Sequence, residues 1–291
     1  MSVRYLTREE KIELARDAMQ ATINVRFQLG VGLEEPICTY SACERLGVPV
    51  RFVDISMEGI YSHMPLPRIL LSAFRPLVRR QFNCAHELGH HVFGHSSKLD
   101  ELLETLEEYD DHSPEEFIVN SFAGHLLMPV LGIRRAFARR GIEAASAHPH
   151  QILAIASEFG VSYDALATQL TFCLNEISHS RRKELIRARP ALQRAMVAAN
   201  EGRGLAFLDD QYSASTLDVE ENYLIVAPKG TVASNHCAVS LGNSEFGEIF
   251  KVVRPGNLEM FVPSTPWTVS IRATRENFVG LARYRYLEDD E

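Results

Sequence analysis

The stretch that decides the fold is Cys84–His95, CAHELGHHVFGH. It contains the pattern H-E-x-x-H, formed by His86, Glu87 and His90. On a helix, residues four apart share a face, so the two imidazoles can converge on one tetrahedral zinc ion. Glu87 lies beside them and can take the proton of a water molecule at the open coordination position. The pattern therefore predicts a hydrolytic metal centre with one Zn²⁺ per chain and Glu87 as the general base.

The competing interpretation is that H-E-x-x-H occurs by chance on a structural helix. The flanking residues, FNCA and LGHHVF, are largely apolar, as in a helix that buries one face and turns a polar edge toward a cleft. Burial of His86, Glu87 and His90 together would be costly without an ion or polar partners. This argument favours a metal site.

A third protein ligand is expected on the next predicted helix, which covers residues 113–129, SPEEFIVNSFAGHLLMP. Glu116 and Asn120 are four residues apart, so a ligand and a hydrogen-bonding partner for a ligand would share a face. Glu115 is the main alternative ligand. A structural interpretation is also open, because Ser113 and Glu116 fit the S-x-x-E capping box at a helix start.

His91 and His95 are less suited than Glu116 to be the third metal ligand. A longer zinc-protease pattern, H-E-x-x-H-x-x-G-x-x-H, would need a glycine and a histidine where this chain has Phe93 and Ser96. His95 is therefore not expected to be the third ligand, and we interpret His91 and His95 as rim or packing groups.

Three side chains are candidate donors to the oxyanion of a hydrolytic transition state, namely Tyr61, His63 and His125. His125 follows Glu116 by nine residues, and a place in the core or on the surface is the alternative for it.

Composition describes an ordinary globular chain of 291 residues, 46% hydrophobic and 23% charged. The net charge of −8 argues against a nucleic-acid-binding protein overall. No apolar run approaches the roughly 20 residues that span a bilayer, and the first 19 residues lack the apolar core of a signal peptide. Five scattered cysteines without C-x-x-C predict neither a disulfide framework nor a cysteine zinc site. We expect a cytoplasmic protein with no membrane association.

Periodicity and turn signals predict the elements around the motif. Helices are expected over residues 7–30 and 39–48, three short strands between 49 and 73, and a helix over 78–93 that carries the motif. Two or three further helices are expected between 131 and 200. After residue 204 the sequence pattern changes to short runs of Val, Ile, Phe and Tyr separated by Gly and Pro, which is typical of β-strands. The fold class is therefore α+β, with three predicted domains at residues 1–130, 131–203 and 204–291.

Residues 153–170, LAIASEFGVSYDALATQL, fit a helix-turn-helix, with Gly160 at the turn and Ser162 as the cap of the second helix. That second helix carries no Lys or Arg and one Asp, although phosphate contacts normally dominate affinity for DNA. Direct DNA binding is therefore possible but disfavoured, and packing or substrate docking is expected instead. Residues 176–203 are basic, which indicates either a solvated helix or a contact with an acidic partner or nucleic acid.

Two linked segments, RRQFNCAHELGHHVFGH and EEFIVNSFAGHLLMP, resemble the ImmA/IrrE family of zinc metallopeptidases. The family pattern is R-x-F-x-x-A-H-E-x-G-H followed by E-x-x-A-N-x-F-A-x-x-L-L-M-P, and the resemblance covers about residues 10–175. It implies a minimal thermolysin-like (gluzincin) domain, followed by a helix-turn-helix-like segment and, here, a β-rich sensor or regulatory domain. It also implies His86, His90 and Glu116 as zinc ligands and Glu87 as the base.

The chain departs from that pattern at three positions of the second segment. Val119 replaces an alanine, His125 stands where glutamate is common, and Ile118 occupies an often acidic position. The last departure leaves the identity of the third ligand open.

By this resemblance, the expected function is zinc-dependent cleavage of one protein partner, a helix-turn-helix repressor or an antitoxin-like protein, in a stress or regulatory response. The alternative is a non-proteolytic, zinc-containing regulator that binds a protein partner or DNA. A third and weaker hypothesis is a transcription factor that acts through residues 149–200.

Overall fold

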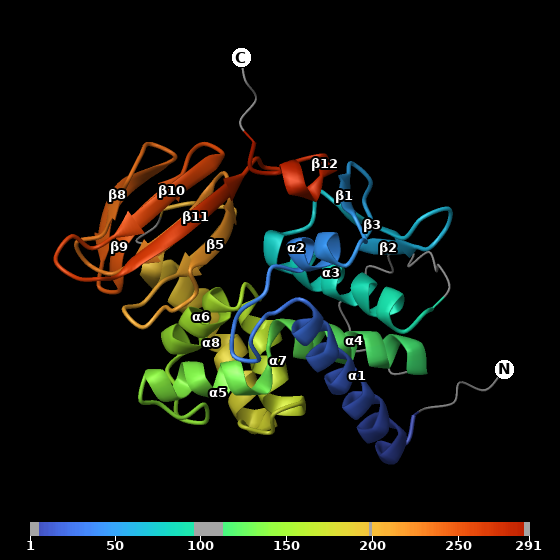
Figure 1. Cartoon of the computed structure of the whole chain (residues 1–291). Helices are drawn as coiled ribbons and strands as arrows, with labels where there is room; N and C mark the ends of the chain where they lie inside the picture. Colours follow the sequence, from blue (N-terminus) through green and yellow to red (C-terminus); the bar gives the residue numbers. More distant parts are fainter. Residues whose placement is uncertain (1–5, 96–112, 198–199, 288–291) are drawn as a thin grey trace. The chain divides into compact units, whose positions relative to one another are not determined.

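The computed structural model describes residues 6–95, 113–197 and 200–287, and its fold is α+β, as predicted (Figure 1). Contacts divide the chain into two compact units. One unit comprises Met1–Gly132 with Val279–Arg283, and the other comprises Ile133–Phe278 with Tyr284–Glu291. The chain therefore leaves the first unit after Gly132, returns to it for Val279–Arg283, and leaves it again at Tyr284.

The first unit begins with two helices, α1 (Arg8–Gln28) and α2 (Thr39–Arg45), close to their predicted ranges. Thr7 caps α1 through the predicted capping box, because its side chain accepts from the Glu10 amide and the Glu10 carboxylate accepts from the Thr7 amide. These local signals were sufficient to place both helices.

A small sheet forms one layer of the first unit. Its strands β1 (Val50–Val53), β2 (Gly59–Ser62) and β3 (Arg68–Ser72) confirm the three predicted strands. Strand β3 lies between the others, parallel to β1 and antiparallel to β2.

The sheet has a fourth strand that the sequence did not predict. Strand β12 (Gly280–Leu281) pairs antiparallel with β1, opposite Arg51 and Phe52, which gives the order β12-β1-β3-β2. We expected these residues in the β-rich domain at 204–291, whereas the structure uses them in the sheet of the first unit. Nothing in a two-residue segment specifies a partner strand 230 residues earlier, so only the tertiary fold decides this pairing.

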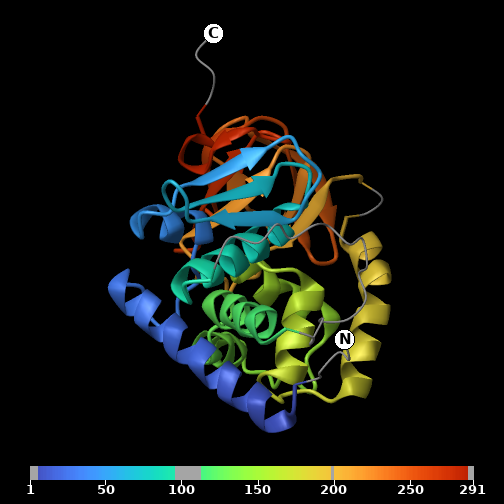
Figure 2. The same ribbon diagram turned by 90° about the vertical axis from the view of Figure 1, so that its right-hand side faces the viewer.

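Helix α3 (Leu77–Val92) packs on the sheet, and α4 (Pro114–Leu127) packs on α3 (Figure 1, Figure 2). Arg80 is buried on α3, with its guanidinium 5.2 Å from the centroid of the Phe52 ring on β1. Helix α1 covers α4 and donates from Arg26 Nη2 to the carbonyl oxygen of Leu126 at 2.5 Å. Sheet, α3, α4 and α1 therefore form successive layers that fix the position of α4.

The second unit starts with four helices, namely α5 (Val130–Arg139, which begins three residues before the unit), α6 (Pro149–Glu158), α7 (Tyr163–Phe172) and α8 (His179–Val197). A turn at Gly160 joins α6 to α7, and Ser162 caps α7 by accepting from the Ala165 amide at 3.1 Å. The assignment of this helix pair as a helix-turn-helix stays a prediction, with direct DNA binding disfavoured.

The second unit also contains two four-stranded sheets, ordered β5-β11-β10-β7 and β4-β6-β9-β8. Their strands are β4 (Gly204–Phe207), β5 (Thr216–Glu220), β6 (Tyr223–Ala227), β7 (Val232–Ala233), β8 (Ala238–Ser244), β9 (Gly247–Val252), β10 (Gly256–Phe261) and β11 (Thr268–Thr274). Helix α6 contacts β4, and α8 contacts β6 and β8, so the helices and the β-rich residues share one unit.

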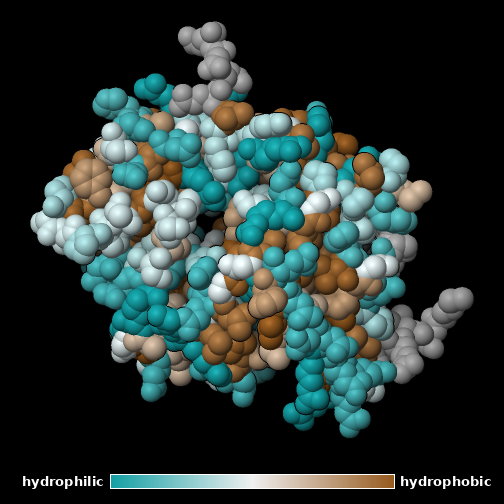
Figure 3. Space-filling view, viewed as in Figure 1, coloured by the Kyte–Doolittle hydropathy of each residue, from teal (hydrophilic) through white to brown (hydrophobic). Residues whose placement is uncertain are grey.

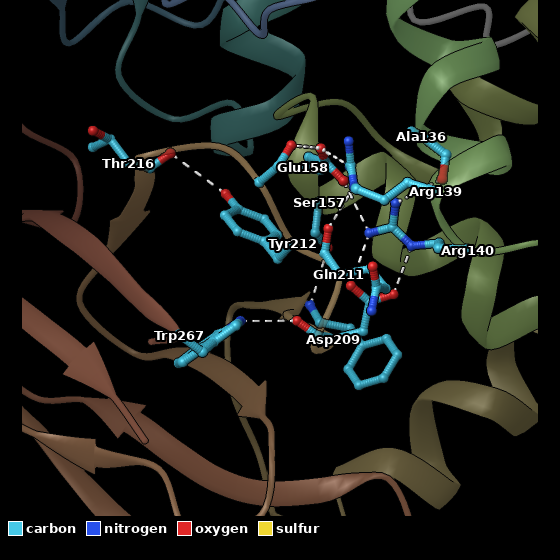
Figure 4. Close-up of polar contacts among 12 residues, drawn as sticks. Ala136, Arg139, Arg140, Ser157, Glu158, Asp209, Gln211, Tyr212, Thr216 and Trp267 are labelled. Carbon is cyan, nitrogen blue, oxygen red and sulfur yellow. Dashed lines mark hydrogen bonds and ion pairs between the residues drawn. The ribbon is translucent and has the colours of Figure 1, made fainter. Parts of the chain in front are cut away.

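A buried cluster of charges joins these helices to the strands (Figure 4). Arg140, directly after α5, contacts Glu158 at the end of α6 at 2.9 Å and Asp209, between β4 and β5, at 2.6 Å. Arg139 contacts the same glutamate at 2.5 Å. The side chains of Arg140 and Glu158 are 4% and 2% exposed, so each buried charge depends on its partners.

Hydrophilic residues cover much of the face seen in Figure 3, with apolar residues in patches between them. By length and hydropathy alone, the helical stretch Pro114–Arg139 could cross a membrane, but 61% of its apolar window is buried inside the structure. A core helix passes the same test, and we interpret α4 and α5 in this way.

Breaking β12 should expose the edge of β1. Gly280 has φ +148°, which proline cannot adopt, so Gly280→Pro should detach the strand. We expect the amides of Val50–Val53 to exchange hydrogen roughly 5–30-fold faster, the factor that corresponds to about 1–2 kcal/mol. Hydrogen exchange read by mass spectrometry measures this.

The matched control is Gly242→Pro in β8, where φ is +103°. It should disturb the second unit and leave exchange in β1 unchanged. Equal exchange of β1 in Gly280→Pro and the wild type would contradict the role of β12.

Candidate metal centre

Helices α3 and α4 bring three candidate ligands together. His86 and His90 lie one turn apart on α3 with their Nε2 atoms 3.3 Å apart. Glu116 on α4 places Oε2 3.3 Å from His86 Nε2 and Oε1 3.8 Å from His90 Nε2. In the part of the chain that the structure describes, these three residues form a group whose ligand atoms lie within 4.8 Å of one another.

The close packing of α3 and α4 makes this convergence possible. A Cβ atom on Gly89 would lie 3.0 Å from the Cβ atom of Val119, so a side chain at this position of α3 would push α4 away. Val119 stands where the resembled family has alanine, and the absent side chain of Gly89 accommodates it.

The structure chooses between the interpretations of the acidic pair at the start of α4. Ser113 is the N-cap, but its side chain makes no capping hydrogen bond, so the capping-box interpretation of Glu116 is wrong. Glu116 faces both imidazoles, whereas Glu115 is not a member of the group. Adjacent residues on a helix point about 100° apart, so only one of the two can face α3.

Asn120 supports His86, as predicted from its spacing. Its Oδ1 atom lies 2.9 Å from His86 Nδ1. With Oδ1 accepting, the imidazole proton is on Nδ1, and the lone pair of Nε2 is directed toward Glu116. The hydrogen bond therefore selects the tautomer that can bind a metal ion through Nε2.

His95 contacts His90, which the sequence interpretation missed. His90 Nδ1 and His95 Nδ1 are 3.0 Å apart, so His95 is a partner of the second imidazole and no mere rim group. The signal for this contact was present in the sequence as Gly94-His95 immediately after the helix. Reading it required the position of the helix end, which the prediction placed one residue too late.

Glu87, the predicted general base, is buried on α3. It directly follows His86 on α3, and only 2% of its surface is exposed. Gly59, the first residue of β2, faces it so closely that a Cβ atom there would lie 3.0 Å from Glu87 Oε1. The absent side chain of Gly59 therefore leaves room for this carboxylate beside the sheet edge.

The three candidate oxyanion donors have different surroundings. Tyr61 on β2 is buried, its hydroxyl lies 2.9 Å from His91 Nδ1, and burial raises its pKa. His63 is exposed. His125 lies nine residues after Glu116, about half a turn around α4, so this helix directs the two side chains to opposite sides. The role of each as a donor stays a prediction.

The donor set fits a divalent metal ion. Two imidazole nitrogens and one carboxylate oxygen converge and leave further coordination positions for water or substrate, which is the arrangement of catalytic zinc sites. At least one ligand nitrogen is held in the metal-binding tautomer by a hydrogen bond from its other nitrogen.

A comparison with protein families matches the part of the chain that contains His86, His90 and Glu116. Residues 43–171 match the peptidase family described as IrrE N-terminal-like domain. No curated protein matches significantly. A solved structure of a Mycobacterium tuberculosis transcriptional regulator is similar at 15% identity and a TM-score of 0.36, over 54% of this chain and 46% of that one. This chain thus spans less than half of that protein.

Neighbouring glutamates on α4 provide a test of the ligand set. We expect Glu116→Gln to weaken zinc binding by about 10-fold or more, because it removes the carboxylate that faces both imidazoles. Glu115→Gln, the matched control, should bind zinc as the wild type does. Competition with a chromophoric chelator measures both affinities, and the reverse order would make Glu115 the ligand.

The buried imidazole of His125 on α4 should make the stability of the protein depend on pH. It is buried, its Nδ1 atom has no hydrogen-bond partner among the described residues, and burial lowers its pKa. The unfolded chain therefore binds a proton more readily, so stability is full above the unfolded pKa of about 6.5 and is lost as the pH falls below it.

Between pH 7.5 and 5.5, the free energy of unfolding of metal-free wild-type protein should fall more than that of His125→Leu. Denaturant unfolding at both pH values measures the difference. An equal fall in the two proteins would mean that His125 takes up a proton in the folded protein as readily as in the unfolded chain.

Proposed function

Because residues 43–171 match the IrrE N-terminal-like domain, we propose that this chain is a zinc-dependent endopeptidase that cleaves a specific protein partner. The observation that carries the proposal is the convergence of His86, His90 and Glu116, with the buried Glu87 next to His86 on the same helix. A metal-binding site that served structure alone would not need an acid at this position.

His86, His90 and Glu116 would hold the zinc ion. When bound there, zinc would supply a Lewis acid that acidifies a coordinated water molecule and polarises the scissile carbonyl group. Asn120 keeps His86 in the required tautomer by accepting from its Nδ1 atom. These are binding and orienting tasks, which do not themselves transfer a proton.

The proton transfers belong to Glu87. Its carboxylate accepts a proton from the attacking water molecule and later delivers it to the nitrogen of the leaving amine. Its burial against Gly59 of β2 restricts the carboxylate to few orientations. One side chain thus serves as general base and then as general acid.

The proposed substrate is a helix-turn-helix repressor or an antitoxin-like protein, cleaved in a stress or regulatory response. Resemblance to the ImmA/IrrE family supports this choice of partner. The β-rich part of the second unit would bind a signal that controls cleavage. The five free cysteines fit a reducing compartment, and we propose the cytoplasm.

A second candidate function is a non-proteolytic, zinc-containing regulator that binds a protein partner or DNA. It is favoured by the fact that a metal ion between α3 and α4 would stabilise the first unit without any chemistry. DNA binding through residues 149–200 has less support. Arg181 and Arg189 on α8 pair with Glu184 and Asp164, which reduces the positive charge left for phosphates.

Replacing Glu87 separates these functions. We expect Glu87→Gln to bind zinc as the wild type does but to cleave a helix-turn-helix repressor at least 100-fold more slowly, because general base catalysis typically contributes 10²–10⁴-fold. Zinc content and the rate of appearance of a defined fragment are measured on the same preparations. A chelator should stop wild-type cleavage and added zinc should restore it.

Cleavage by Glu87→Gln at the wild-type rate would show that the assigned mechanism is wrong. A zinc-loaded wild-type protein that binds its partner and produces no fragment would favour the non-proteolytic regulator instead.

A further inference from the structure

The end of α3 is built by a specific turn. Gly94 follows the last residues of the helix with φ +67°, a conformation that glycine adopts without steric cost. The amide of Gly94 donates to the carbonyl oxygen of His91 at 3.2 Å, and the amide of His95 donates to that of His90 at 2.9 Å. These two hydrogen bonds define the Schellman motif, which ends many helices.

This turn determines what His95 can reach. In a Schellman motif, the residue after the glycine contacts the residue five positions earlier, usually through apolar side chains. Here those two residues are His95 and His90, and their rings meet with centroids 5.2 Å apart and planes at 65°. The usual apolar contact is replaced by a 3.0 Å contact between two Nδ1 atoms.

The ring of His95 is itself held in place. The ring of Phe93 stacks on it at 5.9 Å, and Phe93 meets the ring of Phe122 on α4 at 6.0 Å. Both the backbone turn and an aromatic contact with the second ligand-bearing helix therefore fix the direction of His95 Nδ1. A nitrogen oriented by two independent constraints is suited to orient another group.

The direction of the hydrogen bond follows from the site. His90 Nε2 faces His86 Nε2 at 3.3 Å and Glu116 Oε1 at 3.8 Å, so Nε2 is the atom available to a metal ion. A neutral imidazole that uses Nε2 as a ligand carries its proton on Nδ1. His90 Nδ1 must therefore donate, and His95 Nδ1 must accept.

We propose that His95 is a positioning residue of the metal centre, which fixes the tautomer and ring orientation of His90. It does for His90 what Asn120 on α4 does for His86. The inference rests on the proposed metal site and extends it, because each ligand imidazole then has its own acceptor, one from α4 and one from the turn after α3.

Two substitutions separate hydrogen bonding from packing. His95→Leu keeps an apolar contact of the kind that normally accompanies the turn, but it removes the acceptor. His95→Asn places a carboxamide oxygen near the position of Nδ1 and retains an acceptor. Both substitutions leave the three ligand residues His86, His90 and Glu116 unchanged.

We expect His95→Leu to bind Zn²⁺ about 10–100-fold more weakly than the wild type, the usual effect of losing a partner of a ligand. His95→Asn should recover most of that loss. Competition with a chromophoric chelator gives the affinities, and the visible spectrum of the Co²⁺-substituted protein reports the ligand geometry. Circular dichroism of the metal-free proteins should show that α3 is intact in both variants.

Wild-type zinc affinity in His95→Leu would overturn the proposal. So would an equal loss in His95→Leu and His95→Asn, which would assign the effect to ring packing. Affinity is measured without substrate, so the result stands apart from any failure of proteolysis. Conversely, Glu87→Gln tests catalysis with His95 intact.

Discussion

The close approach of α3 and α4 is the constraint on which the rest of the structure depends. The candidate metal centre depends on a carboxylate on one helix that reaches two imidazoles on the other. That distance is set where Gly89 faces Val119 without a side chain between the backbones. The surrounding layers hold the pair from both sides: Arg80 stacks over the sheet from α3, and Arg26 reaches from α1 to the carbonyl end of α4. In the first unit, the sheet and α1 therefore hold α3 and α4 in contact with each other.

Around the contact between α3 and α4, some polar side chains orient the ligand imidazoles and another, Glu87, is the proposed general base. Two side chains accept from the Nδ1 atoms of the ligand imidazoles, which leaves both Nε2 atoms directed at the glutamate. The acid that follows His86 in the sequence, Glu87, is buried against the first residue of β2 and is not a member of the ligand group. This separation matters physically because a carboxylate that coordinates the ion cannot also accept a proton freely. The arrangement supports hydrolysis better than it supports a purely structural ion.

The course of the chain adds a second constraint. After Gly132 the chain builds a unit of four helices and two sheets, and it then returns to give β12 to the sheet of the first unit. Within the second unit, Arg140 and Glu158 are nearly inaccessible and depend on Asp209, so helices and strands there are joined by charges that cannot be separated cheaply.

The sequence by itself determined whatever depends on near neighbours. The spacing of His86, Glu87 and His90, the capping box at Thr7, the three short strands and the alignment of Glu116 with Asn120 all follow from local periodicity and caps. Tertiary structure alone decided which acid of the pair at 115 and 116 faces α3, that Ser113 does not cap through its side chain, and that His95 contacts His90. It also decided that Gly280 and Leu281 join β1. The physical reason is that periodicity gives the direction of a side chain around its own helix, whereas the identity of the group it meets depends on how separate elements pack.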